Sequence, residues 1–103
     1  MIYEYAYLYI TAGREDEFEQ ALVEASPILK SAEGCQSVDL YRDVETTGSY
    51  LLRVGWAHLD DHLEKFPKSE QAGRFAAAIE QFFDREPTLR HFDSRPVGQP
   101  PAG

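Results

Sequence analysis

The chain has 103 residues, 43% of them hydrophobic and 13% aromatic, so it can form one domain with one core and is too apolar to stay disordered. Its 18 acidic and 10 basic residues give a net charge of -8, which argues against nucleic acid and anionic membranes as partners. The single cysteine, Cys35, excludes an internal disulfide. With no secretion signal or membrane-spanning run in view, we expect a cytoplasmic protein.

Residues 2–10 alternate with a period of two, which predicts a strand with two different faces. One face carries the apolar residues Ile2, Ala6, Leu8 and Ile10 together with Glu4. The other face carries the tyrosines Tyr3, Tyr5, Tyr7 and Tyr9. A carboxylate on an apolar face either reaches water at the strand start or pairs with a histidine or arginine at a pocket rim. The sequence leaves both interpretations of Glu4 open.

Apolar residues spaced by three and four predict a helix over residues 15–32, with Pro27 causing a kink or a tightened last turn. Strands are predicted over 37–44 and 49–57, joined by a hairpin loop that contains Gly48. A short helix over 60–66 should turn Leu59, Leu63 and Phe66 inward and end at Pro67. Ser69 is a suitable N-cap for a helix reaching residue 83, and a last strand is expected over 88–93.

The order strand, helix, strand, strand, helix, strand is typical of a ferredoxin-like α+β fold. It predicts a four-stranded antiparallel sheet with both helices on one face, since each crossover is right-handed. The tyrosine face is then bare, and a second copy covering it would make a homodimer through Tyr3, Tyr5, Tyr7 and Tyr9. We therefore expect one domain over residues 1–94 and a Pro/Gly-rich C-terminal tail over 95–103.

The sequence contains no Gly-rich phosphate loop, no paired cysteines and no metal-binding motif, so we expect no metal site. His62 is either a half-exposed surface histidine or an imidazole that faces a cavity and moves protons near neutral pH. His91 is either hydrogen-bonded in the core or part of the same site. Trp56 is either a core anchor or the wall of a pocket for a flat ligand.

Several segments together resemble the antibiotic biosynthesis monooxygenase family. They are Tyr-Leu-Leu-Arg-Val-Gly-Trp at 50–56, Leu-Asp-Asp-His at 59–62, Phe-Pro-Lys-Ser at 66–69, Phe-Phe at 82–83 and Leu-Arg-His-Phe at 89–92. The resemblance covers about residues 2–93 and implies a dimeric α+β barrel. Some members of this family are cofactor-free oxygenases that turn anthrones or quinols into quinones, and related members degrade haem.

Some positions match the residues that characterise subgroups of this family, and others differ. The polyketide oxygenases of the family have a pocket tryptophan at the position of Trp56, a tyrosine where this chain has His62 and an asparagine where it has Leu52. The haem-degrading members need an asparagine near the position of Ala6 and a histidine near that of Ala76. Both haem-related residues are missing, which argues against haem degradation.

The leading hypothesis is a cofactor-independent monooxygenase that oxidises a planar reduced aromatic with molecular oxygen. Such an enzyme needs an apolar slot, a base and a neighbour that stabilises developing charge. His62 is the expected base, oriented by Glu4 or His91. The expected slot is lined by Trp56, Leu52, Phe66, Phe75, Phe82 and Ala6.

Two alternatives remain. The same slot and base suit a non-oxidative polyketide cyclase or lactone isomerase, which turns over without oxygen. A non-catalytic dimer that binds a small ligand is the other, and Glu4 and both histidines exposed to solvent would favour it.

Overall fold

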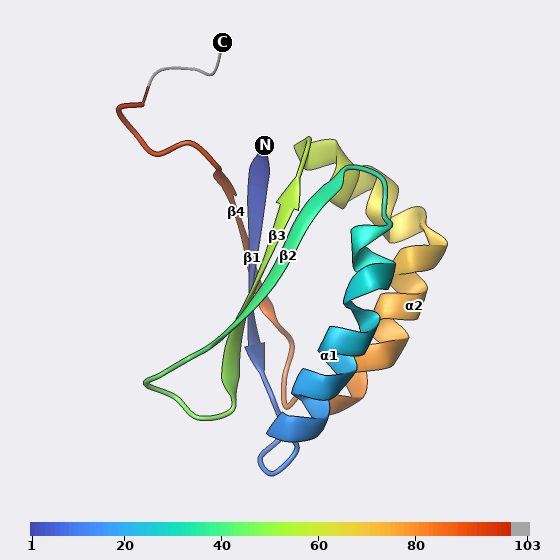
Figure 1. Ribbon diagram of the computed structural model, residues 1–103, viewed down its shortest axis with the longest axis vertical. Coiled ribbons are helices and arrows are strands. Elements are labelled where there is room, and N and C mark those ends of the chain that lie inside the picture. Colours follow the sequence, from blue (N-terminus) through green and yellow to red (C-terminus); the bar gives the residue numbers. More distant parts are fainter. Residues whose placement is uncertain (100–103) are drawn as a thin grey trace.

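The sheet has four antiparallel strands in the order β2-β3-β1-β4. The computed structural model describes residues 1–99, with strands β1 (Ile2–Tyr9), β2 (Cys35–Arg42), β3 (Ser49–Trp56) and β4 (Thr88–Asp93). Helices α1 (Glu15–Lys30) and α2 (Glu70–Ile79) lie over one face of this sheet (Figure 1). The ferredoxin-like α+β fold and the helices on one face are thus confirmed. Residues 100–103 of the predicted tail lie outside the described residues.

The faces of β1 are those that the alternation predicts. Glu4, Ala6 and Leu8 are buried beneath the helices, whereas the four tyrosines are half-buried on the opposite, outer face. The core on the helix side is one continuous cluster that joins β1 and β3 to both helices. Its largest fully buried side chains are Trp56, Phe18, Leu8 and Val54.

The last turn of α1 is tightened, as Pro27 predicts. The backbone N–H of Ser31 donates to the carbonyl oxygens of Pro27 (3.1 Å) and Ile28 (3.2 Å), a shared bond common at helix ends. The helix ends at Lys30, two residues before the predicted end. Gly34 then adopts a φ of +80°, a conformation that side chains with a Cβ rarely take, and turns the chain into β2.

The segment after β3 differs from the short helix predicted there. It forms a π-helical turn, η1 (Asp61–Lys65), followed by a 3₁₀ turn, η2 (Phe66–Lys68), because Pro67 has no N–H to continue a regular helix. His62 faces the sheet, while Leu59 and Leu63 stay 40% and 49% exposed. The predicted inward packing of these two leucines is therefore wrong, and only Phe66 packs against the core.

The remaining elements form near their predicted places, although β2 begins and ends two residues before the predicted range and α2 ends at Ile79, before the predicted residue 83. Oγ of Ser69 accepts a hydrogen bond from the N–H of Ala72 (3.2 Å) and so caps α2, which ends in a 3₁₀ turn, η3 (Glu80–Phe82). β4 pairs with β1 along the sheet edge and puts His91 directly opposite Glu4. In residues 1–99 no helix combines the length and the apolar character needed to span a membrane.

Candidate functional site

Four side chains from four separate elements meet beneath one end of the sheet. They are Glu4 from β1, Trp56 from the end of β3, His91 from β4 and His62 from η1, and we call them the Glu4 cluster. The antiparallel registers bring the strand residues together, because Glu4 pairs with His91 on one side and with the neighbourhood of Trp56 on the other. His62 is the fourth member and lies on the π-helical turn η1, which follows β3 in the chain.

One carboxylate oxygen organises the contacts of the cluster. Nε1 of Trp56 donates a hydrogen bond to Oε1 of Glu4 at 3.0 Å, and Nε2 of His62 lies 3.3 Å from the same oxygen. On its other side, Nδ1 of His62 is hydrogen-bonded to Nε2 of His91 at 2.7 Å. The contacts therefore form a continuous chain from the buried carboxylate to the half-buried imidazole on the edge strand.

Aromatic packing fixes the position of His62. Its ring stacks on Trp56 with the centroids 5.2 Å apart and the planes inclined by 15°. Phe66 packs against the tryptophan at 5.4 Å, and Trp56 itself is 0% exposed. Trp56 is thus a core anchor, and its flat face is occupied by the imidazole.

Burial moves the pKa values in this cluster in opposite directions. Glu4 is 7% exposed, and burial raises the pKa of its carboxyl, although the hydrogen bond from Trp56 opposes this change. Burial also lowers the pKa of His62, and burial together with the neighbouring His62 lowers the pKa of His91. The surroundings therefore favour neutral histidines and a carboxyl group that retains a proton more readily than an exposed one.

Asp61 holds the turn that carries His62. Its side chain is buried, and Oδ2 accepts a hydrogen bond from the N–H of His58 at 2.9 Å, while Oδ1 pairs with Nζ of Lys65 at 3.2 Å. A Cβ at Gly34 would lie 2.1 Å from Oδ2, so only glycine fits beneath this carboxylate. Sequence analysis did not assign this role to Asp61, since nothing in the local pattern brings Gly34 to it.

The structure divides the predicted slot. Trp56 and Phe66 lie at the cluster, but Ala6, Leu52 and Phe75 are packed within the continuous core. Phe82 lies near the other end of the sheet, with its ring 6.1 Å from that of Phe18. In the part of the chain that the structure describes, these four residues are buried in the core between the sheet and the helices, and they do not line the open slot that was predicted for the substrate.

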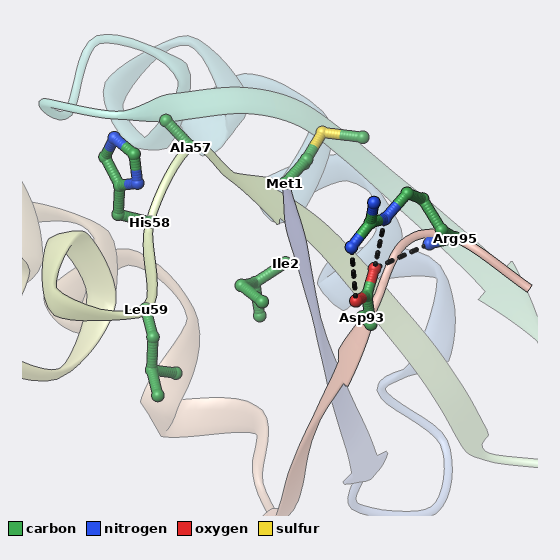
Figure 2. Close-up of a pocket in the computed structure, with 7 residues that line it drawn as sticks. All are labelled: Met1, Ile2, Ala57, His58, Leu59, Asp93 and Arg95. Carbon is green, nitrogen blue, oxygen red and sulfur yellow. Dashed lines mark hydrogen bonds and ion pairs between the residues drawn. The ribbon is translucent and has the colours of Figure 1, made fainter. Parts of the chain in front are cut away.

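A hollow of about 420 Å³ opens at the same end of the sheet as the cluster, and Figure 2 shows the residues that line it. It is lined by Met1, Ile2, Ala57, His58, Leu59, Asp93 and Arg95. Ile2 pairs with Asp93, the next pair on the same sheet face after Glu4 and His91, so these two lining residues are one backbone step of about 7 Å along their strands from the cluster residues. Asp93 is held by Arg95 at its wall, as the dashed lines in Figure 2 show. None of these seven residues was a predicted site residue.

The arrangement is suited to moving a proton. A carboxylate, two imidazoles and a fixed indole N–H form a connected set, with one end buried and the other near the surface. Within the part of the chain that the structure describes, no group of three His, Cys, Asp or Glu residues is arranged to hold a metal ion.

Comparison with known proteins gives the family. Residues 1–78 match the family model described as antibiotic biosynthesis monooxygenase. The uncharacterized protein YczJ of Bacillus subtilis is 38% identical over 92 residues, which cover 89% of this chain and 97% of that protein.

Solved structures agree with this result. A Bordetella bronchiseptica protein that carries the name of the same family superposes with a TM-score of 0.88 and 30% identity, covering 91% of this chain and 96% of its own. A Caulobacter crescentus structure with a TM-score of 0.78 and 21% identity, covering 92% and 90% of the two chains, has the same fold. The chain therefore belongs to the antibiotic biosynthesis monooxygenase family.

Proposed function

We propose that the protein is a monooxygenase that oxidises a planar, reduced aromatic compound of the anthrone, quinol or polyketide type with molecular oxygen and without a cofactor. The family gives the reaction class, as its name states. The observation that carries the proposal is the Glu4 cluster, in which a buried carboxylate and two imidazoles are linked beside the indole of Trp56.

The cluster supplies the base that this chemistry needs first. Removal of a proton from an anthrone gives a carbanion that is electron-rich enough to pass one electron to oxygen. The carbon radical and superoxide combine to a peroxide, which takes up a proton and then loses water to leave the quinone. One oxygen atom enters the product and the other leaves as water, so anthrone and O₂ give anthraquinone and H₂O.

The hollow in Figure 2 is the region that this function assigns to the substrate. Its volume of about 420 Å³ lies within the range of small-molecule sites. Ile2 and Leu59 offer apolar contact to a substrate in the hollow. An aromatic compound bound there reaches the cluster from the side of His91.

A homodimer through the outer face is the second part of the proposal. This face holds the four tyrosines together with Tyr41 and Phe92, which are 46% and 54% exposed. Its charged residues in the strands are Asp39, Arg53 and Arg90, so two copies of a chain with net charge -8 meet here with little repulsion.

The dimer is tested by light scattering after size exclusion. Tyr7→Glu puts a charge on the outer face between Leu51 and Thr88 and should leave a monomer, because an unpaired charge is costly in an interface. Val23→Glu, on the exposed surface of α1, is the matched control and should remain dimeric. A wild-type protein that is monomeric at micromolar concentration would refute this part of the proposal.

The reaction is tested by mixing the metal-stripped protein with a reduced anthrone or naphthol in air, while quinone absorbance and oxygen uptake are followed together. We expect one oxygen consumed per quinone formed, at a rate above the protein-free control and unchanged by a chelator. Absence of uptake across a panel of such compounds would overturn the proposal. Conversion that continues without oxygen would favour the cyclase or isomerase instead.

A further inference from the structure

Both ring nitrogens of His62 are occupied inside the protein. Nε2 lies 3.3 Å from Oε1 of Glu4, and Nδ1 is hydrogen-bonded to Nε2 of His91 at 2.7 Å. Nδ1 cannot take a proton directly from a bound molecule while it is hydrogen-bonded to His91, and Nε2 lies against the buried carboxylate of Glu4 and not at the surface. If His62 is to act as the base, a second residue must therefore take the proton from the substrate and pass a proton on to His62.

His91, unlike His62, has a ring nitrogen without a partner in the described part of the chain. Its Nε2 is bonded to His62, and no hydrogen bond within residues 1–99 engages its Nδ1. In that part of the chain the only buried side-chain nitrogen or oxygen without a partner is Nε of Arg53, so Nδ1 of His91 is not sealed in the core. His91 also lies on the edge strand β4, two residues before Asp93, which lines the hollow.

The contacts allow two protonation states that differ by one proton. In the first, Glu4 is an anion, His62 carries its proton on Nε2, and His91 donates from Nε2 to Nδ1 of His62. In the second, His91 carries its proton on Nδ1, His62 on Nδ1, and Glu4 is a neutral acid. The second state follows from the first when Nδ1 of His91 gains one proton and each inner proton moves one step toward Glu4.

We propose that Glu4, His62 and His91 form a proton relay in which Nδ1 of His91 accepts the substrate proton, His62 passes a proton on and Glu4 stores it. This inference rests on the proposed function for the identity of the substrate, but not for the relay itself. The first transfer breaks the C–H bond of the substrate and makes an N–H bond at Nδ1 of His91. Each later transfer breaks one N–H bond and makes another N–H or O–H bond, so both histidines end neutral. The stored proton returns along the same path to the peroxide formed later.

The electrostatics favour this pair of states. Burial lowers the pKa of both histidines, which disfavours an imidazolium, and raises the pKa of Glu4, which favours the neutral acid. Trp56 donates to Oε1 of Glu4 and opposes its protonation in part. Further charges on the elements that carry the two histidines are the Asp61–Lys65 pair on η1 and Asp93 on β4, which is paired with Arg95. The thiol of Cys35 is neutral, because burial raises its pKa.

Nitrogen NMR of the histidine rings tests the relay without any substrate. The chain has three histidines, so His58→Gln and His91→Gln variants assign the signals. We expect His62 in the full-length protein to change from the Nε2–H to the Nδ1–H tautomer as the pH falls, without becoming a cation. The carboxyl carbon of Glu4 should show protonation at the same pH.

Glu4→Gln is the decisive variant, because glutamine keeps the shape of the side chain but cannot store a proton. In this variant His62 should keep one tautomer over the pH range in which its ring is neutral, while His58→Gln should leave the switch unchanged. A wild-type His62 that keeps one tautomer or becomes a cation would overturn the relay, as would a switch that persists in Glu4→Gln. Because no turnover is measured, these results are independent of whether aromatic substrates are oxidised.

Discussion

Glu4 and Glu19 are carboxylates beneath opposite ends of the same sheet, and their surroundings move their pKa values in opposite directions. At one end burial raises the pKa of Glu4. At the other, hydrogen bonds from Arg42 (2.6 Å between Nη2 and Oε1) and from the hydroxyl of Tyr50 (2.6 Å to Oε2) lower the pKa of Glu19. The comparison shows that a neighbouring cation lowers the pKa of a carboxyl group and favours its anion. Burial beside neutral histidines raises the pKa and favours the protonated form.

The largest expected effect comes from exchanging each carboxylate for its amide. Glu4→Gln should lower kcat/KM for quinone formation by about 100-fold, because general acid–base groups contribute about 10²–10⁴-fold. His62→Ala should lower it at least about tenfold for the same reason. Glu19→Gln is the control and should stay within about twofold. Equal losses in both amide variants would mean that the two ends do not differ in function.

The next effect concerns the glycine beneath Asp61. Gly34→Ala should cost about 3 kcal/mol of the free energy of unfolding, because a Cβ meets the Asp61 carboxylate and the residue keeps a positive φ. Gly13→Ala is matched to it, since Gly13 has a φ of +88° and no atom within 4 Å of the added Cβ. It should cost about 1 kcal/mol. Urea denaturation measures both, and equal losses would contradict the close packing.

The pH dependence of stability should distinguish the two carboxylates in sign. The raised pKa of Glu4 means that the folded state binds more protons above pH 4.5, so the stability it contributes is present at low pH and declines as the pH rises. The lowered pKa of Glu19 has the reverse effect, and its contribution is lost as the pH falls below 4.5.

Denaturation of the wild type and both amide variants between about pH 3 and pH 8 measures these contributions as differences. The difference between wild type and Glu4→Gln should widen on acidification, and that for Glu19→Gln should shrink. The two histidines add a common loss of stability below about pH 6.5, since the unfolded chain binds their protons more readily. Parallel pH profiles for the two variants would contradict the opposite shifts.

The smallest effect is at the helix cap behind the His62 turn. Oγ of Ser69 accepts from the N–H of Ala72 and donates to the carbonyl oxygen of Phe66 at 2.6 Å, so it ties η2 to α2. Ser69→Ala should cost about 1 kcal/mol of the free energy of unfolding. Ser31→Ala removes only a bond from Oγ to the carbonyl of Ile28 at the other helix and should cost about 0.5 kcal/mol or less. Thermal unfolding of the two variants would show whether the cap matters more.

The sequence predicts the sheet and helices well because they depend on local periodicity. The alternation in residues 2–10 separates the tyrosine face from the helix face and singles out Glu4 as an unusual residue. It does not decide whether Glu4 reaches water, because that depends on the register of β4, which brings His91 opposite it. Register between strands far apart in the chain is a property of the whole sheet.

The turn that carries His62 shows a second limit of local patterns. An α-helical spacing puts Leu59 and Leu63 inside, but the π-helical turn before Pro67 directs His62 inward and exposes both leucines. The contact between Asp61 and Gly34 joins segments 27 positions apart, and no local pattern encodes it. The predicted roles of the individual site residues remain predictions until the variants are measured.

Trp56 is the one tryptophan in the chain, and it is stacked on His62. The protein therefore contains a single indole emitter in direct contact with the middle residue of the cluster. A cationic imidazole quenches indole fluorescence, whereas a neutral one does so far less. The fluorescence of the unlabelled protein, followed during an acid titration, therefore reports whether the His62 ring becomes a cation. If the ring instead passes its proton to the carboxylate of Glu4, the emission should stay nearly constant.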